Sequence, residues 1–253
     1  MNNFSDIHAS IYEQPIDERI RKFLKLENIY MKINNHMDID SKYDAYSTLL
    51  NISELFINLT RSEIKRDLIS EIETQKVRYQ EYSKLDGADR IKLNSIMEKQ
   101  NAILKTLHDL EANYLNVLKN DELLQTIIKH INTSCADLDY WLSRDHDFRK
   151  NQINLWLELI KPIENSIFFC LDLLRKSSET VEITAKDGMY LFKMDIEKKI
   201  RLLRVTMKTD NYFFPRISVG PQRATIAFMT IDDNNKIIRL NQDINFVLDL
   251  CYI

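Results

Sequence analysis

Glycine is scarce in this chain, and its scarcity limits the folds that the chain can adopt. Three of the 253 residues are glycine, Gly87, Gly188 and Gly220, where an average chain of this length would contain about 18. Glycine supplies the positive-φ positions that tight turns and phosphate-binding loops need. Neither a G-x-G-x-x-G fingerprint nor a P-loop motif is present. The sequence therefore predicts a mainly helical protein that is not a nucleotide-loop enzyme.

The charge balance and the cysteines narrow the class further. The chain has 35 Lys and Arg against 38 Asp and Glu, a formal net charge of −3, which does not suggest a nucleic-acid partner. The sequence contains no run of about 18 apolar residues that would predict a membrane span. The N-terminus does not have the pattern of a secretory signal. Cys135, Cys170 and Cys251 lie far apart, as is typical of reduced cytosolic thiols. We therefore expect a cytoplasmic protein.

Helical periodicity covers residues 15–178, which we expect to form an α-helical domain. Pro15 is expected in the first turn of the first helix, and a second helix is predicted over residues 44–59. Residues 132–150 have a mixed pattern, in which four aspartates are interrupted by Trp141. Residues 151–177 are predicted as one strongly apolar, buried helix that bends at Pro162.

A long antiparallel helical hairpin is predicted near residues 61–113. Thr60 and Glu63 have the spacing of a capping box for its first helix, and Gly87 is expected just beyond that helix's C-terminus. Gln75 and Gln100 lie near the predicted seam, so the tip is expected to project into solvent. The predicted buried residues of the second helix are Ile91, Ile96, Ile103, Leu104, Leu107, Leu110 and Tyr114.

Residues 179–253 have a different pattern, with β-branched runs separated by turn residues. Strands are predicted in six short runs, and Pro215 is interpreted as a turn residue. The predicted runs are 181–184, 190–194, 200–208, 224–231, 236–240 and 244–250. The extended segment 9–14 is expected to add a strand. The predicted fold class is therefore α+β: a mainly α-helical domain with a smaller antiparallel β domain.

A search for catalytic or metal-binding patterns gives weak candidates. His130 and Cys135 are close in sequence, but a helix end is expected between them and no second ligand pair is present. The acidic group Asp137, Asp139, Asp145 and Asp147 lacks the spacing of an EF-hand and is interpreted as helix-capping residues. We expect no metal, no cofactor and no enzymatic activity, with a thiol or small-molecule enzyme as the weaker alternative.

Basic residues are more informative than these candidates. Arg21 and Lys25 are four residues apart, which places both on one helix face. Arg61, Lys65 and Arg66 open the predicted hairpin. Such clusters on neighbouring helices can line a positive groove despite a negative net charge, although an ordinary solvated face has the same composition.

Ordered sequence blocks along nearly the whole chain resemble the ZapD family of bacterial cell-division proteins, which are associated with the FtsZ ring. The blocks include residues 12–21 (YEQPIDERIR), 51–55 (NISEL), 171–175 (LDLLR) and 214–218 (FPRIS). Further matching positions are Arg61, Lys65, Cys135, Trp141, Trp156 and Arg223. Each block is short, and their common order makes the set specific.

The resemblance implies a non-enzymatic homodimer that binds the C-terminal tail of FtsZ and bundles FtsZ protofilaments at mid-cell, promoting Z-ring assembly and septation. It implies tail contacts at positions where the family carries basic residues: Arg21, Lys25, Arg61, Lys65 and Arg223. At Glu122, Asp139 and Ala227 this sequence departs from basic or His residues of the family. A helical adaptor that binds another partner through the hairpin remains the alternative.

Overall fold

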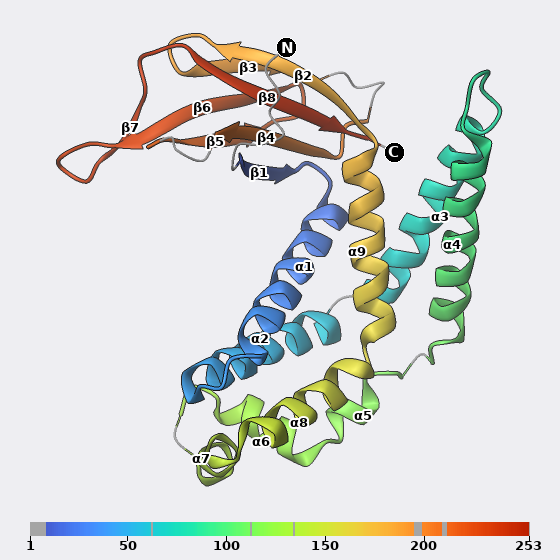
Figure 1. Ribbon diagram of the computed structural model, residues 1–253, viewed down its shortest axis with the longest axis vertical. Helices are drawn as coiled ribbons and strands as arrows, with labels where there is room; N and C mark the ends of the chain where they lie inside the picture. Colours follow the sequence, from blue (N-terminus) through green and yellow to red (C-terminus); the bar gives the residue numbers. More distant parts are fainter. Residues whose placement is uncertain are drawn as a thin grey trace. The chain divides into compact units, whose positions relative to one another are not determined.

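The chain forms two compact units in a computed structural model that describes residues 9–61, 63–111, 113–133, 135–194, 199–208 and 212–252. The β unit takes its described residues from 1–21 and 172–253, and the helical unit is Lys22–Leu171 (Figure 1). Both limits fall within helices, α1 and α9, which each contain residues of both units. The predicted α+β class, mainly helical with a smaller antiparallel β part, is confirmed.

The helices follow the apolar periodicity of the sequence. Phe23, Leu26 and Ile33 of α1 are buried, because residues three and four apart share one helix face. The helices are α1 (Glu18–Met37), α2 (Lys42–Arg61), α3 (Ile64–Tyr82), α4 (Arg90–Asp109), α5 (Asn116–Lys119), α6 (Glu122–His130), α7 (Ala136–Ser143), α8 (His146–Glu158) and α9 (Lys161–Lys176).

Aspartates at the helix starts accept hydrogen bonds from otherwise unpaired backbone N–H groups. The Asp17 carboxylate accepts from the N–H groups of Arg19 and Ile20 at the start of α1. Asp89, Asp121 and Asp145 accept from backbone N–H groups three residues later and cap α4, α6 and α8.

The predicted capping box at Thr60 is wrong. Thr60 lies in the last turn of α2, and its hydroxyl donates to the carbonyl of Phe56 over 2.9 Å. A threonine hydroxyl near a helix end can satisfy a carbonyl of its own helix in this way. Helix α3 therefore begins at Ile64, after Glu63, which makes no side-chain capping bond.

The prediction of one bent helix over residues 151–177 is also wrong. The chain forms α8 and α9, separated at residues 159–160, and Pro162 lies in the first turn of α9. Proline is tolerated there because the first-turn N–H groups have no intrahelical acceptor. Residues 132–150, whose sequence pattern is mixed, contain helix α7 and the start of α8.

Helices α3 and α4 form the hairpin, and their register is fixed by cross-helix bonds. Lys65 Nζ donates to the carbonyl of Leu110, and Lys76 Nζ donates to Asn101 Oδ1 over 2.6 Å. In this antiparallel register Gln75 lies across from Gln100, and both are fully buried. Helix α3 ends at Tyr82, and Gly87 takes a φ of 80° in the connecting turn, so its predicted place just after the helix is wrong.

Most of the predicted core of α4 is not buried. Of the residues in this helix, Gln100 and Leu107 are buried, whereas Ile91 is 87% exposed. The remaining predicted residues, Ile96, Ile103, Leu104, Leu110 and Tyr114, are partly buried. The physical reason is that α4 packs on α3 along one narrow stripe, so helical periodicity overestimates how much of it is covered.

The β unit contains two antiparallel sheets whose facing residues share one core. Sheet A has the order β1 (Ala9–Pro15), β4 (Leu202–Lys208), β8 (Ile244–Cys251), β2 (Ser178–Ala185). Sheet B has the order β3 (Met189–Lys193), β6 (Arg223–Ile231), β5 (Phe214–Val219), and β7 (Ile237–Arg239) also pairs with β6. Phe246 of sheet A and Phe228 of sheet B meet with ring centroids 5.1 Å apart.

Two prolines lie in edge strands, where the sequence predicts other structures. Pro15 belongs to β1 and not to the first turn of α1, and Pro215 belongs to β5 and not to a turn. Edge strands accept proline because one side of the strand needs no ladder hydrogen bond. Strand β5 is therefore absent from the six predicted runs, which correspond to β2, β3, β4, β6, β7 and β8.

A row of polar side chains crosses sheet A on the face opposite the core. Glu13, Arg204, Asp249 and Thr180 are successive cross-strand partners on β1, β4, β8 and β2. Thr180 Oγ1 donates to Asp249 Oδ1 over 2.7 Å. Arg175, near the end of α9, donates to both Glu13 carboxylate oxygens. This row of polar side chains connects β1, the first described strand, with β8, the last described strand.

Candidate functional site

The five basic residues predicted as partner contacts are divided between the two units. Arg21 and Arg223 belong to the β unit, and Lys25, Arg61 and Lys65 belong to the helical unit. Arg21 and Lys25 lie one turn apart on α1. Arg21 forms an exposed ion pair with Glu18 over 2.7 Å.

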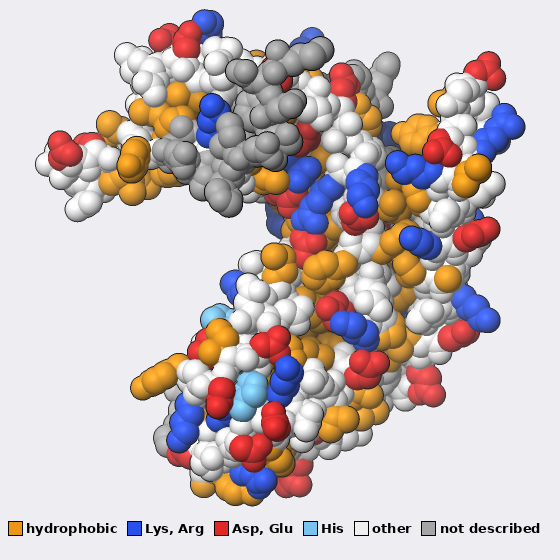
Figure 2. Space-filling view, viewed as in Figure 1, with side chains coloured by type: hydrophobic (Ala, Val, Ile, Leu, Met, Phe, Trp, Pro, Cys, Tyr) orange, Lys and Arg blue, Asp and Glu red, His pale blue; other side chains and the backbone are white. Residues whose placement is uncertain are grey.

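Within the helical unit, two of the predicted cations have local partners. Lys25 lies 3.3 Å from Glu54 of α2, and Lys65 donates to the carbonyl of Leu110 beyond the end of α4. Arg61, the last residue of α2, is exposed and forms no ion pair with a described residue. On the face of the helical unit that Figure 2 shows, Lys and Arg are interspersed with Asp and Glu. The helical unit therefore does not present a field of one sign on this face.

The outer face of sheet B has a different character. Ala224, Ile226 and Phe228 of β6 point into the core, so the alternating residues Arg223, Thr225 and Ala227 lie on the opposite face. Cross-strand pairing adds residues of β3, β5 and β7 to this face. Four of its described strand residues are cations, Lys193, Arg216, Arg223 and Arg239, and we call this surface the basic face.

None of these four cations forms an ion pair with a described residue, and none of the strand residues on the basic face is acidic. Arg223 and Lys193 are direct cross-strand partners. Like charges in this position destabilise a sheet. An unfavourable pair of like charges that no acidic side chain of the fold offsets is typical of a binding surface.

Apolar side chains lie between these cations. Leu191 is 56% exposed and Ile231 is 60% exposed, and Ile231 pairs with Ile237 of β7. Figure 2 shows hydrophobic side chains gathered at the end of the β unit where β6 and β7 meet. The basic face can therefore accept a ligand that combines carboxylates with apolar side chains.

Sequence reasoning identified Arg223 and missed Lys193, Arg216 and Arg239. The sequence contains only a weak signal for these three residues, because each is a single cation in a different strand. The period-2 alternation around Arg216 could have placed it on an outer face, but strand β5 was not recognised. Ala227, where the sequence departs from the family pattern, lies on the same face directly opposite Arg216.

The other candidates for chemistry are dispersed. Cys135 precedes the first residue of α7, and His130 is the last residue of α6. Asp145 caps α8 and Asp137 lies in the first turn of α7. Burial raises the pKa of the Cys251 thiol to about 12, so this thiol stays protonated at neutral pH. Among the residues that the structure describes, no group of three or more His, Cys, Asp or Glu is placed to hold a metal.

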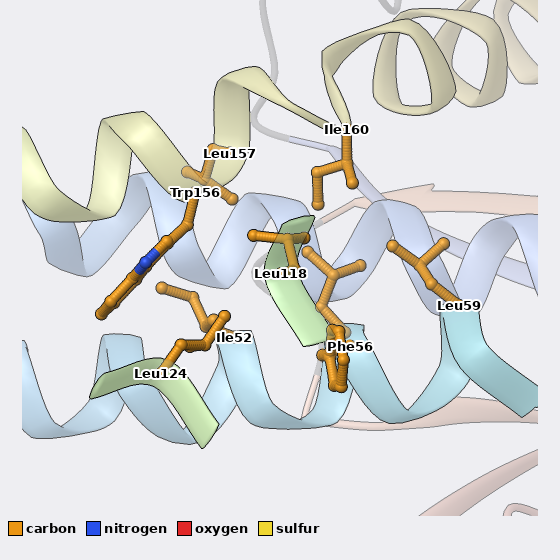
Figure 3. Close-up of a pocket in the computed structure, with 9 residues that line it drawn as sticks. Ile52, Phe56, Leu59, Leu118, Leu124, Trp156, Leu157 and Ile160 are labelled. Atoms are coloured by element: carbon orange, nitrogen blue, oxygen red, sulfur yellow. The ribbon is translucent and has the colours of Figure 1, made fainter. Parts of the chain in front are cut away.

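A small pocket in the helical unit is lined entirely by apolar side chains (Figure 3). Ile52 and Leu59 of α2, Leu124 of α6 and Trp156 of α8 contribute to its wall, and all are buried. Without a polar or titratable lining group the pocket has no means of orienting a substrate. No described helix is long and apolar enough to cross a membrane.

Comparison of the chain with known proteins identifies its family. The family model described as "ZapD: Cell division protein" matches residues 24–227. The chain is 24% identical over 250 residues to the cell division protein ZapD of Methylococcus capsulatus, covering 96% of this chain and 98% of that protein. It is 25% identical over 247 residues to the ZapD of Nitrosomonas europaea, covering 95% and 94%. It is 26% identical over 236 residues to the ZapD of Klebsiella pneumoniae, covering 90% and 94%. The chain therefore belongs to the ZapD family of cell division proteins.

Proposed function

We propose that this protein binds the C-terminal tail of FtsZ and, as a homodimer, crosslinks FtsZ protofilaments in the cytoplasm at mid-cell. It acts without catalysis, promoting assembly of the Z-ring. The observation that carries the proposal is the basic face: four cations without an ion-pair partner among the described residues, in a chain of the ZapD family.

The tail contacts that we propose are Arg21, Lys25, Arg61, Lys65 and Arg223, extended by the neighbours of Arg223 on the basic face. Arg216 lies directly opposite Ala227, a separation of about 5 Å between strand partners. Arg216 can thus supply the positive charge that the family carries at the position of Ala227. Arginine also offers a planar fork that binds a carboxylate with two hydrogen bonds.

Bundling of filaments requires at least two tail-binding sites on one molecule. A two-fold dimer carries two equivalent tail sites, so one molecule can link two filaments. Each filament displays many tails, and linked weak contacts raise the overall avidity without a new contact. Charged contacts of this kind mainly accelerate association and weaken as salt rises.

Co-sedimentation of the full chain with FtsZ tests this proposal. We expect bundles at low salt, fewer bundles as salt rises, and none with FtsZ that lacks its C-terminal tail. Absence of bundling at low salt, or bundling that persists after deletion of the tail, contradicts the proposal.

Charge reversal tests the location of the site. Arg216→Glu with Arg223→Glu is expected to weaken binding of a tail peptide at least tenfold, because two attractions become repulsions. Lys92→Glu is the matched control, since Lys92 is an exposed cation of α4 outside the proposed site. Equal affinity of the double variant and the control contradicts the assignment of the basic face.

The helical-adaptor alternative rests on exposed apolar residues in the distal half of the hairpin. Val77 is 53%, Leu85 59% and Ile91 87% exposed, and such side chains can pack against another helix. Leu85→Ser with Ile91→Ser discriminates between the two functions. FtsZ bundling is unaffected by this change if the tail binds through the basic residues, and it is lost if the hairpin tip recruits the filament.

A further inference from the structure

We infer that the end of the α3–α4 hairpin is a membrane-anchoring site, which inserts Leu85 and Ile91 into the surface of a bilayer that contains anionic lipids. The inference goes beyond the proposed function. The site, residues 80–99, belongs to the helical unit and contains none of the proposed tail contacts. We call these residues the tip.

No residue of the tip is buried. The buried residue of α3 nearest to the connecting turn is Tyr79, and that of α4 is Gln100. All residues between them lie in the described part of the chain, and each is exposed or partly exposed. Around Gly87, in the turn, no described atom lies within 4 Å of the position that a Cβ would occupy. The tip therefore extends into solvent without a covering element.

Large apolar side chains lie at the connecting turn. Leu85 is 59% exposed and Ile91 is 87% exposed. Tyr82, 37% exposed, packs its ring on that of Tyr79 with centroids 6.1 Å apart. Backbone bonds from Leu85 N to Tyr82 O and from Ala88 N to Leu85 O fold the turn. The fold thus holds two aliphatic side chains in water, and their transfer to an apolar phase is favourable.

The distribution of these side chains fits the surface of a bilayer better than a partner helix. A helix that docks on another presents apolar residues at i, i+3 or i+4 and i+7. Asn94, Ser95 and Glu98, which follow Ile91 on its face of α4, are polar and exposed. Apolar exposure on this face therefore ends in the first turn of α4. Insertion into the boundary between headgroups and acyl chains, about 5–10 Å deep, needs apolar residues only at the end of the hairpin.

Cations surround the two aliphatic side chains. Lys84, Arg90 and Lys92 are exposed and form no ion pair with a described residue. Of the two carboxylates in the same stretch, that of Asp89 accepts from Lys92 N and caps α4, which leaves Asp86. Figure 2 shows Lys or Arg and hydrophobic side chains near one another at this end of the hairpin.

This combination selects the lipid headgroup. Lysine and arginine extend their charged ends into the headgroup layer while their stems stay at the apolar boundary. Each cation near the surface favours anionic over zwitterionic lipid. The tip therefore fits a bilayer that contains an anionic phospholipid, and two aliphatic side chains make the anchoring weak and reversible.

Flotation of the full chain with vesicles tests the inference. The probes are vesicles of phosphatidylcholine alone and vesicles that mix phosphatidylcholine with phosphatidylglycerol. We expect binding to the mixed vesicles, at least about tenfold weaker binding to phosphatidylcholine alone, and a decrease as salt rises. Absence of binding to the mixed vesicles at low salt overturns the inference.

Removal of the aliphatic side chains locates the contact. Leu85→Ser with Ile91→Ser is expected to lower the partition coefficient on mixed vesicles at least about tenfold, because little apolar area is left to insert. Val117→Ser with Leu155→Ser is the matched control, since Val117 and Leu155 are 61% and 64% exposed and lie outside the tip. Both double variants are expected to keep the far-UV circular dichroism spectrum of the wild type. A folded tip variant that binds like the wild type overturns the inference.

The basic face can also attract anionic vesicles, so its variant separates the two surfaces. Arg216→Glu with Arg223→Glu is expected to change vesicle binding far less than the tip variant does. Loss of vesicle binding in this variant, together with retention in the tip variant, assigns the contact to the basic face and overturns the inference.

Leu85→Trp reports insertion directly. On mixed vesicles its emission is expected to shift to shorter wavelength and to be quenched by brominated acyl chains. Trp141 and Trp156 are 1% and 3% exposed, so their emission is expected to change little. A vesicle-bound Leu85→Trp protein that keeps the emission of a solvent-exposed indole overturns the inference.

Co-sedimentation with FtsZ in the absence of lipid distinguishes this inference from the proposed function. The tip variant is expected to bundle FtsZ like the wild type. A wild-type chain that binds mixed vesicles through the tip but does not bundle FtsZ supports the membrane site and contradicts the FtsZ proposal. A tip variant that loses FtsZ bundling and keeps vesicle binding shows that the tip docks on protein, and it overturns the inference.

Discussion

Glu13 on β1 and Arg204 on β4 lie directly opposite each other, and Arg204 Nε donates to Glu13 Oε1 over 2.9 Å. The same carboxylate accepts from Arg175 over 2.9 and 2.8 Å. The Glu13 side chain is 20% exposed and those of Arg204 and Arg175 are 18% and 25% exposed. One carboxylate therefore holds two partly desolvated cations, and its loss affects three elements of the β unit.

Glu13→Gln is expected to lower the free energy of unfolding by about 2 kcal/mol, because it leaves both guanidinium groups without their counter-charge. The control is Glu18→Gln, which breaks the exposed pair with Arg21 and is expected to cost less than about 0.5 kcal/mol. Chemical denaturation of both variants checks this prediction. Equal costs would show that the row across sheet A contributes no more than an ordinary surface pair.

Acid is expected to weaken the β unit through the same carboxylate. Burial would raise the pKa of Glu13, but the hydrogen bonds and charges of Arg175 and Arg204 outweigh it and hold this pKa below its ordinary value of 4.5. Because the folded-state pKa is the lower one, the stabilisation is present above pH 4.5 and is lost as the pH falls through the folded-state value. Melting temperatures between pH 7 and pH 3 are expected to fall less steeply for Glu13→Gln than for the wild type.

Asp121→Ala is expected to destabilise the helical unit by about 2 kcal/mol. Asp121 Oδ1 accepts from Leu124 N and caps α6, and Oδ2 accepts from the indole Nε1 of Trp156 over 2.9 Å. Asp121→Asn keeps one acceptor oxygen and is expected to lose about half as much. Intrinsic fluorescence during urea unfolding reports both the stability and the surroundings of Trp156. An Asp121→Ala variant with wild-type stability contradicts this double role.

Gln100→Leu is expected to raise the free energy of unfolding by about 1 kcal/mol. Both amide atoms of Gln100 are buried without a hydrogen-bond partner among the described residues, and such groups carry an uncompensated desolvation cost. The control is Asn101→Leu on the exposed side of α4, where Asn101 accepts from Lys76 and no gain is expected. Destabilisation by Gln100→Leu would show that the glutamine is satisfied in solution.

Lys193→Glu is expected to stabilise the fold and weaken tail binding at the same time. It converts the like-charged pair with Arg223 into an attractive one, a change of about 0.5–1 kcal/mol, while removing a cation from the basic face. Thermal unfolding and tail-peptide titration of one preparation measure both effects. A variant that gains stability and keeps its affinity would separate Lys193 from the tail site.

The fold class followed from local sequence patterns. The wrong predictions arose where one residue type is compatible with two different structures. Proline suits the first turn of a helix and also the edge of a sheet, so Pro15 and Pro215 could not be assigned without knowing which strands are edges. Thr60 has a hydroxyl that can cap the next helix or bond back to its own. In each case a contact with a distant or neighbouring element, which one sequence does not show, decides the outcome.

The candidate site was predictable only in part, because side-chain partners are set by tertiary structure. Periodicity placed Arg21 and Lys25 on one helix face, but it could not show that Lys25 lies beside Glu54 or that Lys65 reaches the carbonyl of Leu110. Conversely, the cations of the basic face are spread over four strands, and pairing of those strands is what assembles them.

The pairing of β1 with β4 constrains the order in which the chain can fold. Strand β1 is synthesised before the helical unit, but its partner β4 begins at Leu202, after the whole helical unit has been synthesised. Contacts of such long sequence separation form slowly, because the intervening chain must be closed into a loop before they stabilise anything. The helical unit can therefore become ordered during translation, whereas the β unit can be completed only after synthesis of β8. A nascent chain thus acquires its basic face only after the helical unit, which delays the binding of a partner at that face until β7 has been synthesised.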